Sequence, residues 1–508
     1  MFKNVGSTWV LILLQIVVLM KLTPFVVEKL GLSQYGMWAV IVGITGYVRL
    51  LILGIPLASV RYTAEHVAKE DAAGANRAIA TCIGICILLG VVVWIVGAVG
   101  YPAFDSLYLS GAAASSLSPD TVHGARIAFA IVMLQVGMGF AMRLPYGIFD
   151  AHGDFVVRNA VMVGELCLRL ALTLLLLWWR PSLPSLAMVQ VVCMLAEFGV
   201  MLVLIKRRYP AIRIGVRDFD KSIVRSILSF SIFAMVLNVG ALLAFQTDAM
   251  VIGHFLGFKE TTEFEIGNKF FDPMTQLLIG VSAVVMPLAT RLKAKGNIDE
   301  LRHVFLKWSK ICLSIVLLIG LYLLVLGPAF IGWWMGPLFV EPSGRVLQVL
   351  MLSFLVYLPV RGVAIAVMMG VGKPALPAIS FLVMGVLNLL MSIALVGSMG
   401  ILGVALGTAI PNVLFAVVIL AMACKELGVR VSDYLGYVGG RAVFGALVPL
   451  ASLVWFEYGL HVRGLVPLIA AGVAMVIVFA LTWIYFVFKD DPYLDLRLEL
   501  ARVLRRAD

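Results

Sequence analysis

Apolar runs long enough to cross a lipid bilayer recur from one end of this 508-residue chain to the other, and this recurrence constrains the fold more than any other feature. Hydrophobic residues make up 62% of the chain and charged residues only 13%, which excludes most soluble architectures. No stretch is left over for a large water-soluble domain. The sequence therefore predicts an all-α polytopic membrane protein.

About fourteen transmembrane helices are expected where the hydrophobic runs are bounded by turn residues and charge. They lie near residues 7–29, 35–60, 79–102, 123–147, 157–179, 183–205, 227–257, 264–290, 306–335, 346–370, 374–397, 401–424, 437–457 and 464–488. The runs at 227–257 and 306–335 are long enough to require tilt or an interfacial portion.

The distribution of lysine and arginine over the short loops predicts the orientation. One side carries 27 basic residues, including seven from Lys206 to Arg225 and six from Arg291 to Lys310. The other side carries five, namely Lys29, Arg180, Lys259, Arg345 and Arg463. Both termini are therefore expected in the cytoplasm, in agreement with an even number of helices. The net charge of +11 is explained by this topology and by contacts with anionic lipid, so we expect no nucleic-acid binding.

The basic loop at 206–225 divides the chain into two halves that resemble each other. Leu30-Gly31 after the first expected helix matches Leu256-Gly257 after the seventh, at an offset of 226 residues. The segment 151–154 (AHGD) matches 371–373 (VGK) at an offset near 219. Because six is even, both six-helix repeats enter from the same side and are related by a pseudo-two-fold axis along the membrane normal. We expect an N-lobe at 1–208, a cytoplasmic linker at 209–226, a C-lobe at 227–424, and two further helices with a cytoplasmic tail at 425–508.

Three segments, 30–39 (LGLSQYGMWA), 246–253 (QTDAMVIG) and 400–407 (GILGVALG), carry a resemblance to a known family. Their order and spacing resemble the polysaccharide-biosynthesis (Wzx-like) oligosaccharide flippases of the multidrug/oligosaccharidyl-lipid/polysaccharide exporter superfamily. The resemblance implies a transporter of the bacterial inner membrane with two six-helix lobes around a central cavity. It would move a polyprenyl-pyrophosphate-linked oligosaccharide from the cytoplasmic to the outer leaflet by alternating access, for surface polysaccharide assembly. The expected partners are this lipid-linked substrate, the lipid bilayer, a polysaccharide polymerase and glycosyltransferases.

Seven basic residues remain inside the expected spans, and each one near the midplane would cost about 2.5–3.5 kcal/mol if it faced lipid. They are Lys21, Arg49, Arg126, Arg143, Arg169, Lys269 and Arg361. The acidic residues at similar depth are Glu165, Glu197, Asp248 and Asp272. Such charges must face protein or water.

Lys21, Arg49 and Arg361 have no acidic residue three or four positions away, so their charges need another helix, water or a ligand. We expect helices one, two, eight and ten to line a cavity in which these cations contact the pyrophosphate. Arginine suits bidentate contacts with phosphate, and lysine acts as a point charge. The full set of predicted substrate-binding residues is Lys21, Arg49, Arg126, Arg169, Lys269 and Arg361.

Structural roles are open alternatives for several of these residues. Glu165 and Arg169 are four apart on one helix, and Lys269 and Asp272 are three apart, so each pair can form a structural bridge. Arg126 and Arg143 lie near opposite ends of one expected helix, from which they can reach the interface. Glu197 stays unassigned.

Asp248, beside Gln246 and Thr247, is the first candidate for coupling to an ion or proton, and Asp272 is the second. A carboxylate inside a span can bind Na⁺ or change its protonation between two access states. The alternative for Asp248 is a counter-ion role toward Lys21 or Lys269. No cofactor and no metal site is expected apart from this possible Na⁺ or H⁺ coupling.

The usual enzyme motifs are absent from the sequence, which has no GxxxxGK[ST], GxSxG, HExxH or CxxC. No catalytic residue is predicted, and ATP hydrolysis by this chain alone is excluded. A membrane-embedded glycan polymerase would carry a sizeable extracytoplasmic loop, whereas the longest one here runs only from Tyr101 to Thr121. A cation-coupled multidrug exporter of the same superfamily, the other alternative, would favour twelve helices and an acidic cavity.

Overall fold

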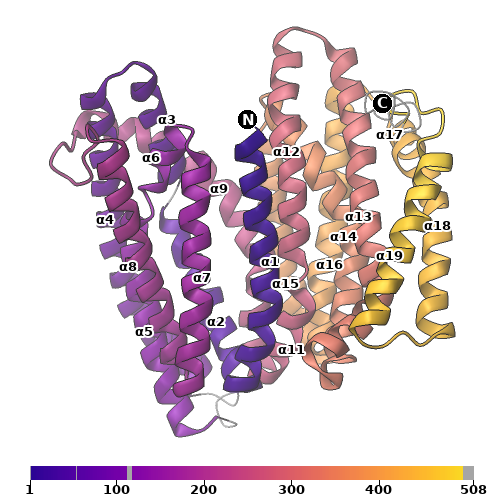
Figure 1. The fold of residues 1–508 in the computed structure, drawn as a ribbon, viewed down its shortest axis with the longest axis horizontal. Coiled ribbons are helices and arrows are strands. Elements are labelled where there is room, and N and C mark those ends of the chain that lie inside the picture. The colour runs from indigo at the N-terminus through magenta and orange to yellow at the C-terminus, as the bar shows by residue number, and fades with distance from the viewer. Residues whose placement is uncertain (1, 53, 111–116, 496–508) are drawn as a thin grey trace. The chain divides into compact units, whose positions relative to one another are not determined.

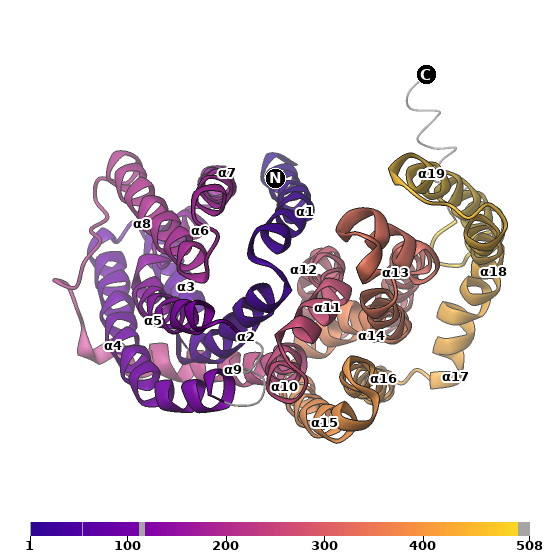
Figure 2. The same ribbon diagram turned by 90° about the horizontal axis from the view of Figure 1, so that it is seen from below.

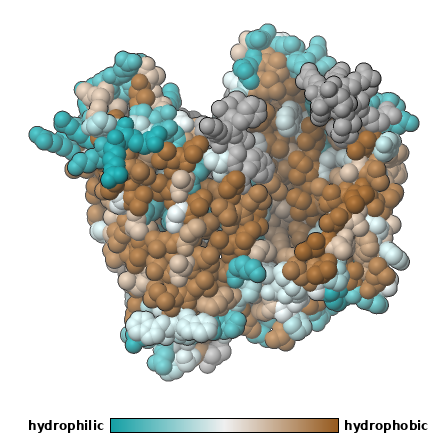
Figure 3. Space-filling view, in the orientation of Figure 1, coloured by the Kyte–Doolittle hydropathy of each residue, from teal (hydrophilic) through white to brown (hydrophobic). Residues whose placement is uncertain are grey.

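The computed structural model describes residues 2–52, 54–110 and 117–495, and for 2–6, 8, 9, 229–238, 241 and 244 it describes the backbone alone. All regular structure in these ranges is helical (Figure 1), and thirteen candidate spans are long and apolar enough to cross a membrane. On the face shown in Figure 3, apolar side chains cover the middle of the helices and hydrophilic ones gather toward their ends. The predicted all-α polytopic membrane fold is confirmed. The expected span at 227–257 is not among the thirteen, and most of the expected tail lies outside the described residues.

The chain divides into two compact units, which we call the first and the second unit. The first unit comprises Met1–Leu242 and Gln246–Thr262, and the second comprises Leu243–Phe245 and Glu263–Asp508. Within the first unit the predicted linker at 209–226 is hydrogen-bonded to the helix that begins at Ala72. The Asn76 side chain donates to the carbonyl of Ala211 (3.0 Å) and accepts from the backbone of Arg213 (2.8 Å). The predicted domain boundaries at 209–226 stay a prediction.

The first unit is built from ten helices and the start of an eleventh. They are α1 (Phe2–Leu30), α2 (Leu32–Val48), α3 (Ile55–Ala68), α4 (Ala72–Phe104), α5 (Pro119–Met142), α6 (Tyr146–Ala151), α7 (Phe155–Trp179), α8 (Leu183–Arg208), α9 (Lys221–Phe245), α10 (Thr247–Phe255) and α11 (Phe258–Asn268). Helix α5 packs against α4 and α8, and α7 packs against α1 and α8 (Figure 2). Helices α4 and α5 approach so closely that a Cβ on Gly90 would lie 2.5 Å from the carbonyl oxygen of Gly137.

The second unit is arranged around one central helix, α14. Its helices are α12 (Phe271–Ala294), α13 (Ile298–Met335), α14 (Pro342–Gly370), α15 (Ala375–Met399), α16 (Ile401–Leu427), α17 (Val431–Tyr434), α18 (Arg441–Val454) and α19 (Leu465–Thr482). Helix α14 contacts α12, α13 and α16 (Figure 2). Helices α18 and α19, the two expected beyond the repeats, both pack on α13.

Four of the expected spans are broken rather than continuous. The 35–60 span is interrupted by a 3-10 turn at Arg49–Ile52 before α3, and the 123–147 span is interrupted between α5 and α6. Pro56 and Pro145 lie at these breaks and lack the N–H that a continuous helix requires. The 264–290 span instead starts at Phe258 and breaks between α11 and α12, and the 227–257 span breaks at Gln246. Basic residues lie at three of the four breaks, namely Arg49, Arg143 and Lys269.

The backbone supports the internal repeat that the sequence predicts. Gly31 and Gly257, 226 positions apart, both have positive φ (80° and 129°), and so do Gly153 and Gly372 (73° and 84°), 219 positions apart. Glycine adopts this conformation without a steric penalty, which explains why it occupies these helix ends. Similar but not identical offsets relate two pairs of cations: Lys269 follows Arg49 by 220 positions, and Arg361 follows Arg143 by 218.

Candidate functional site

Three arginines of the first unit come together near the middle of its spans. Arg49 lies in the 3-10 turn after α2, Arg143 directly follows α5, and Arg169 lies on α7. Arg143 and Arg169 both lie close enough to Arg49 for their positive charges to repel its own. Arg49 and Arg143 are exposed, and the side chain of Arg169 is 37% exposed. At this depth an exposed guanidinium group requires water or a polar ligand, because lipid cannot solvate it.

Two carboxylates lie beneath these arginines. The Glu165 side chain is 14% exposed, and its Oε1 accepts from Arg169 Nε at 2.9 Å and also from Arg169 Nη2. Glu197 on α8 is 9% exposed, and its Oε1 accepts from the hydroxyl of Tyr146. Arg143, Glu165 and Arg169 all act electrostatically on Glu197. The predicted bridge between Glu165 and Arg169 is present, but it belongs to a larger network.

The network has a cationic outer layer and an acidic inner layer. Three guanidinium groups against two carboxylates leave one positive charge uncompensated when all five groups are ionised. Arginines present several N–H donors in a fixed plane, an arrangement that fits the oxygens of a phosphate or diphosphate. Chemically, this face of the first unit is suited to hold an anion at membrane depth.

Arg126, also a predicted substrate-binding residue, lies away from this network. It lies on α5 and precedes Arg143, which directly follows this helix, by 17 positions, about 25 Å at 1.5 Å per residue. Its guanidinium group pairs with Asp105 through Nε–Oδ1 (2.7 Å) and Nη2–Oδ2 (3.3 Å). A bidentate pair of this kind compensates the charge of Arg126 within the protein, and its contact with a substrate stays a prediction.

The second unit brings Lys269 and Asp272 together with Glu265, a residue that sequence reasoning missed. Lys269 lies at the break between α11 and α12. Its positive charge attracts the Glu265 carboxylate, and the negative charge of Asp272 repels it. Asp272 is exposed in the first turn of α12. The spacing of four between Glu265 and Lys269 was the sequence signal that could have found this group.

Arg361 on α14 is surrounded by aromatic rings. Its guanidinium carbon lies 5.5 Å from the Phe245 ring centroid, 5.7 Å from that of Tyr357 and 5.6 Å from that of Phe381. Its Nη1 donates to the Tyr357 hydroxyl at 2.9 Å. Cation–π contacts therefore compensate a charge for which the sequence offers no nearby acid.

The two remaining predicted residues lie elsewhere in the first unit. Lys21 is exposed on α1, and no ion pair within the described ranges includes it. Asp248 on α10 is 3% exposed. It lies close enough to Tyr47 of α2 to interact electrostatically with its hydroxyl. The structure thus brings Arg49 and Arg169 together and keeps Asp248 and Asp272 in separate units. No three His, Cys, Asp or Glu side chains of the described chain gather as metal ligands would.

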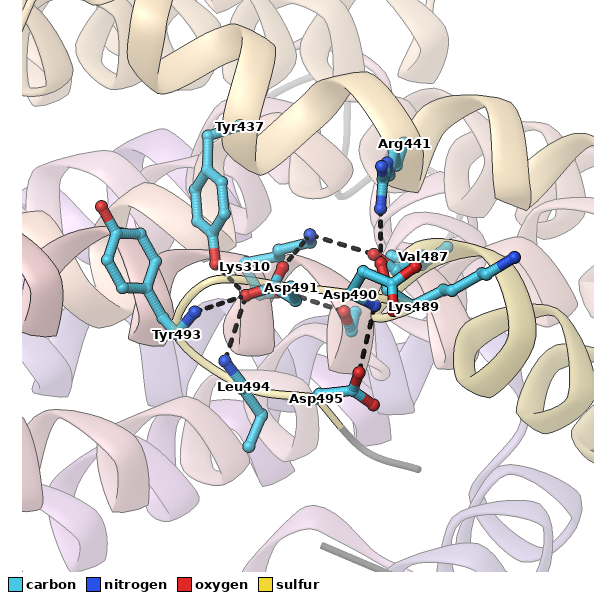
Figure 4. Close-up of polar contacts among 11 residues, drawn as sticks. Lys310, Tyr437, Arg441, Val487, Lys489, Asp490, Asp491, Tyr493, Leu494 and Asp495 are labelled. Atoms are coloured by element: carbon cyan, nitrogen blue, oxygen red, sulfur yellow. Dashed lines mark hydrogen bonds and ion pairs between the residues drawn. The ribbon is translucent and has the colours of Figure 1, made fainter. Parts of the chain in front are cut away.

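A second buried charge cluster joins the last two helices to α13, and sequence reasoning missed it (Figure 4). Lys310, expected among the cytoplasmic loop cations, has a side chain only 2% exposed, and its Nζ lies 2.5 Å from Asp491 Oδ2. Tyr437 donates to Asp491 Oδ1 at 2.8 Å, and Lys310 Nζ also donates to the carbonyl of Val487 at 3.1 Å. Asp491 lies 181 positions after Lys310, so no local pattern could have indicated the pair.

The fold of this chain is shared by solved transporters of the MOP superfamily. One is an inward-facing multidrug resistance MATE family transporter, with a TM-score of 0.68 and 18% identity over 81% of this chain and 94% of that one. Another is a MOP superfamily transporter from Pyrococcus furiosus, described as having a binding pocket of reverse polarity, with a TM-score of 0.61 and 16% identity over 84% and 95%. The chain shares the fold of these structures.

The family follows from the sequence comparison. Residues 2–293 match the family described as "Polysaccharide biosynthesis protein", and the chain belongs to this family. The uncharacterized membrane protein EpsK of Bacillus subtilis (strain 168) is 20% identical over 498 residues, covering 94% of this chain and 93% of EpsK. The uncharacterized membrane protein MJ1068 of Methanocaldococcus jannaschii is 20% identical over 207 residues, or 41% of this chain and 40% of MJ1068. The predicted resemblance is confirmed.

Proposed function

We propose that this protein is a flippase that moves a polyprenyl-pyrophosphate-linked oligosaccharide from the cytoplasmic to the outer leaflet of a bacterial inner membrane. It works by alternating access, with both termini in the cytoplasm, and serves surface polysaccharide assembly. Membership of the polysaccharide biosynthesis family and the MOP transporter fold support this class. The partners we propose are the enzymes that build and extend the glycan, namely a polysaccharide polymerase and glycosyltransferases.

The observation that carries the proposal is the exposed cationic face formed by Arg49, Arg143 and Arg169. A diphosphate presents several anionic oxygens, and guanidinium groups at membrane depth attract them more strongly than groups surrounded by bulk water. Recognition of the diphosphate does not depend on the attached sugar. Lys269 and Arg361 follow Arg49 and Arg143 by 220 and 218 positions, and with Lys21 they stay proposed substrate-binding residues.

The multidrug exporter is the weaker alternative because a cationic face repels the cations that such exporters commonly carry. A glycan polymerase is weaker still, since such an enzyme would carry a sizeable extracytoplasmic loop and the longest one predicted here runs only from Tyr101 to Thr121. Energy for transport would come from Na⁺ or H⁺ coupling, for which Asp248 and Asp272 stay the predicted residues.

The test is transfer of a pyrophosphate-linked glycolipid in proteoliposomes by the wild type, Arg49→Ala, Arg143→Ala and Arg361→Ala. Loss of one charge-assisted contact costs about 1.5–3 kcal/mol, so at subsaturating glycolipid each variant is expected to transfer it about 10- to 150-fold more slowly. Arg430→Ala is the matched control because its side chain is 84% exposed outside this face. Unimpaired transfer by a properly folded Arg49→Ala/Arg143→Ala double variant would refute the assignment.

A further inference from the structure

Glu197 is a carboxylate buried near the middle of α8, within the span Leu183–Arg208. The charged and titratable groups that face it come from every neighbouring element. They are Arg143 at the end of α5, Tyr146 of α6, Glu165 and Arg169 of α7, and Cys193 of α8 itself. An ionised carboxylate at this depth is stable only when it is compensated.

The way Glu197 is compensated differs from that of Glu165. Two nitrogens of Arg169 bind Glu165 directly. The hydrogen bond to Glu197 comes from the neutral hydroxyl of Tyr146, so its positive compensation comes through space from Arg143 and Arg169. These two arginines also form the exposed layer that would contact an anion.

An anion bound to these arginines therefore competes with Glu197 for the same positive charge. Once the anion neutralises Arg143 and Arg169, the ionised form of Glu197 loses much of its compensation, while the neutral form loses little. The carboxylate then takes up a proton from water. Tyr146 already donates to Oε1, which leaves Oε2 to carry that proton.

The geometry points to Glu197 as a proton-binding residue that couples anion binding on Arg49, Arg143 and Arg169 to the uptake of one proton. The inference rests on the proposed function only for the identity of the anion, a phosphate or diphosphate ester. By linkage, protonation of Glu197 strengthens anion binding as much as anion binding favours protonation. Affinity for the anion thus rises by up to about tenfold for each unit that the pH falls through the titration.

The experiment measures binding of inorganic pyrophosphate to the full chain in lipid nanodiscs between pH 5.5 and 8.5. Calorimetry in two buffers of different ionisation enthalpy counts the protons taken up. Glu197→Gln is compared with wild type at each pH. Subtracting the proton uptake of one protein from that of the other removes the contribution of pyrophosphate, which itself titrates. Glu197→Asp tests rescue, and Glu28→Gln is the matched control because the Glu28 side chain is 74% exposed.

Wild type, Glu197→Asp and Glu28→Gln are expected to take up about one proton more than Glu197→Gln. Glu197→Gln should bind at high pH with the affinity that wild type reaches only at low pH. Retention of the full pH dependence by Glu197→Gln overturns the inference, and so does loss of binding at every pH, which indicates a structural role. Wild type that binds pyrophosphate with this coupling but transfers no glycolipid overturns the proposed function alone. Absence of binding by wild type overturns both.

Discussion

Charged side chains at membrane depth are compensated in three different ways in this protein. Arg169 uses a carboxylate one helical turn away, Arg126 uses Asp105 from the preceding helix, and Arg361 uses three aromatic rings. The first kind is visible in the sequence, because it depends on a spacing of four within one helix. The partner of Arg126 depends on tertiary packing, and of the rings around Arg361 only that of Tyr357, four positions earlier on α14, could be found from the sequence.

At the residue scale, the Lys310–Asp491 pair is expected to contribute strongly to stability. Both side chains are at most 2% exposed, and removing one partner leaves an uncompensated buried charge. Asp491→Asn and Lys310→Met should each lower the free energy of unfolding by about 3–5 kcal/mol. The control is Asp433→Asn, which breaks an exposed pair with Arg430 and should cost less than about 1 kcal/mol. Thermal unfolding in detergent measures both, and equal effects would contradict the burial argument.

The same pair predicts a dependence of stability on pH. Burial by itself raises the pKa of Asp491, but hydrogen bonds from Lys310, the Tyr493 backbone and Tyr437 together hold this pKa below its ordinary value of 3.8. The carboxylate therefore stabilises the fold above the pKa of the unfolded chain, and this contribution is lost as the pH falls through the folded value. The unfolding temperature of wild type should fall toward that of Asp491→Asn between pH 5 and pH 3. Parallel curves for the two proteins over this range would be the contrary result.

At the scale of elements, hydropathy predicts where helices lie but not where they break. Thirteen of the fourteen expected spans coincide with candidate spans, because a run of about 20 apolar residues is a strong signal. An interruption such as Arg49–Ile52 changes the hydropathy of that run little. Pro56 and Pro145 were the available signals, yet proline also occurs inside continuous helices here, as Pro24 and Pro359 show.

Close packing of α2 against the start of α11 gives a prediction for Gly36. A Cβ at this position would lie 1.7 Å from the carbonyl oxygen of Phe258, which is backbone and cannot move alone. Gly36→Ala should therefore destabilise the protein by at least about 1–3 kcal/mol. Gly199 on α8 has no atom within 4 Å of its built Cβ, so Gly199→Ala should leave stability unchanged or raise it by up to about 1 kcal/mol. Unfolding temperatures that shift in the same direction for both variants would argue against this packing.

At the scale of the whole molecule, the internal repeat was the most productive signal in the sequence. The glycine offsets of 226 and 219 predicted the two equivalent pairs of turns that the backbone shows. Offsets of 220 and 218, close to these, connect Arg49 with Lys269 and Arg143 with Arg361. The repeat could not reveal how the two halves differ. Glu165 and Glu197 beside the arginines, and the aromatic rings around Arg361, are not related to each other by these offsets.

Orientation in the membrane is a further property of the whole molecule, and the 27 to 5 distribution of basic residues predicts it. Arg345 and Arg430 are matched probes, since their side chains are 61% and 84% exposed and they fall on opposite predicted sides. Cys167 is exposed and the other five cysteines are buried, so Cys167→Ser provides a suitable background. A membrane-impermeant maleimide should label Arg345→Cys in intact spheroplasts and Arg430→Cys only after permeabilisation. The reverse pattern would place the termini outside and contradict the predicted orientation.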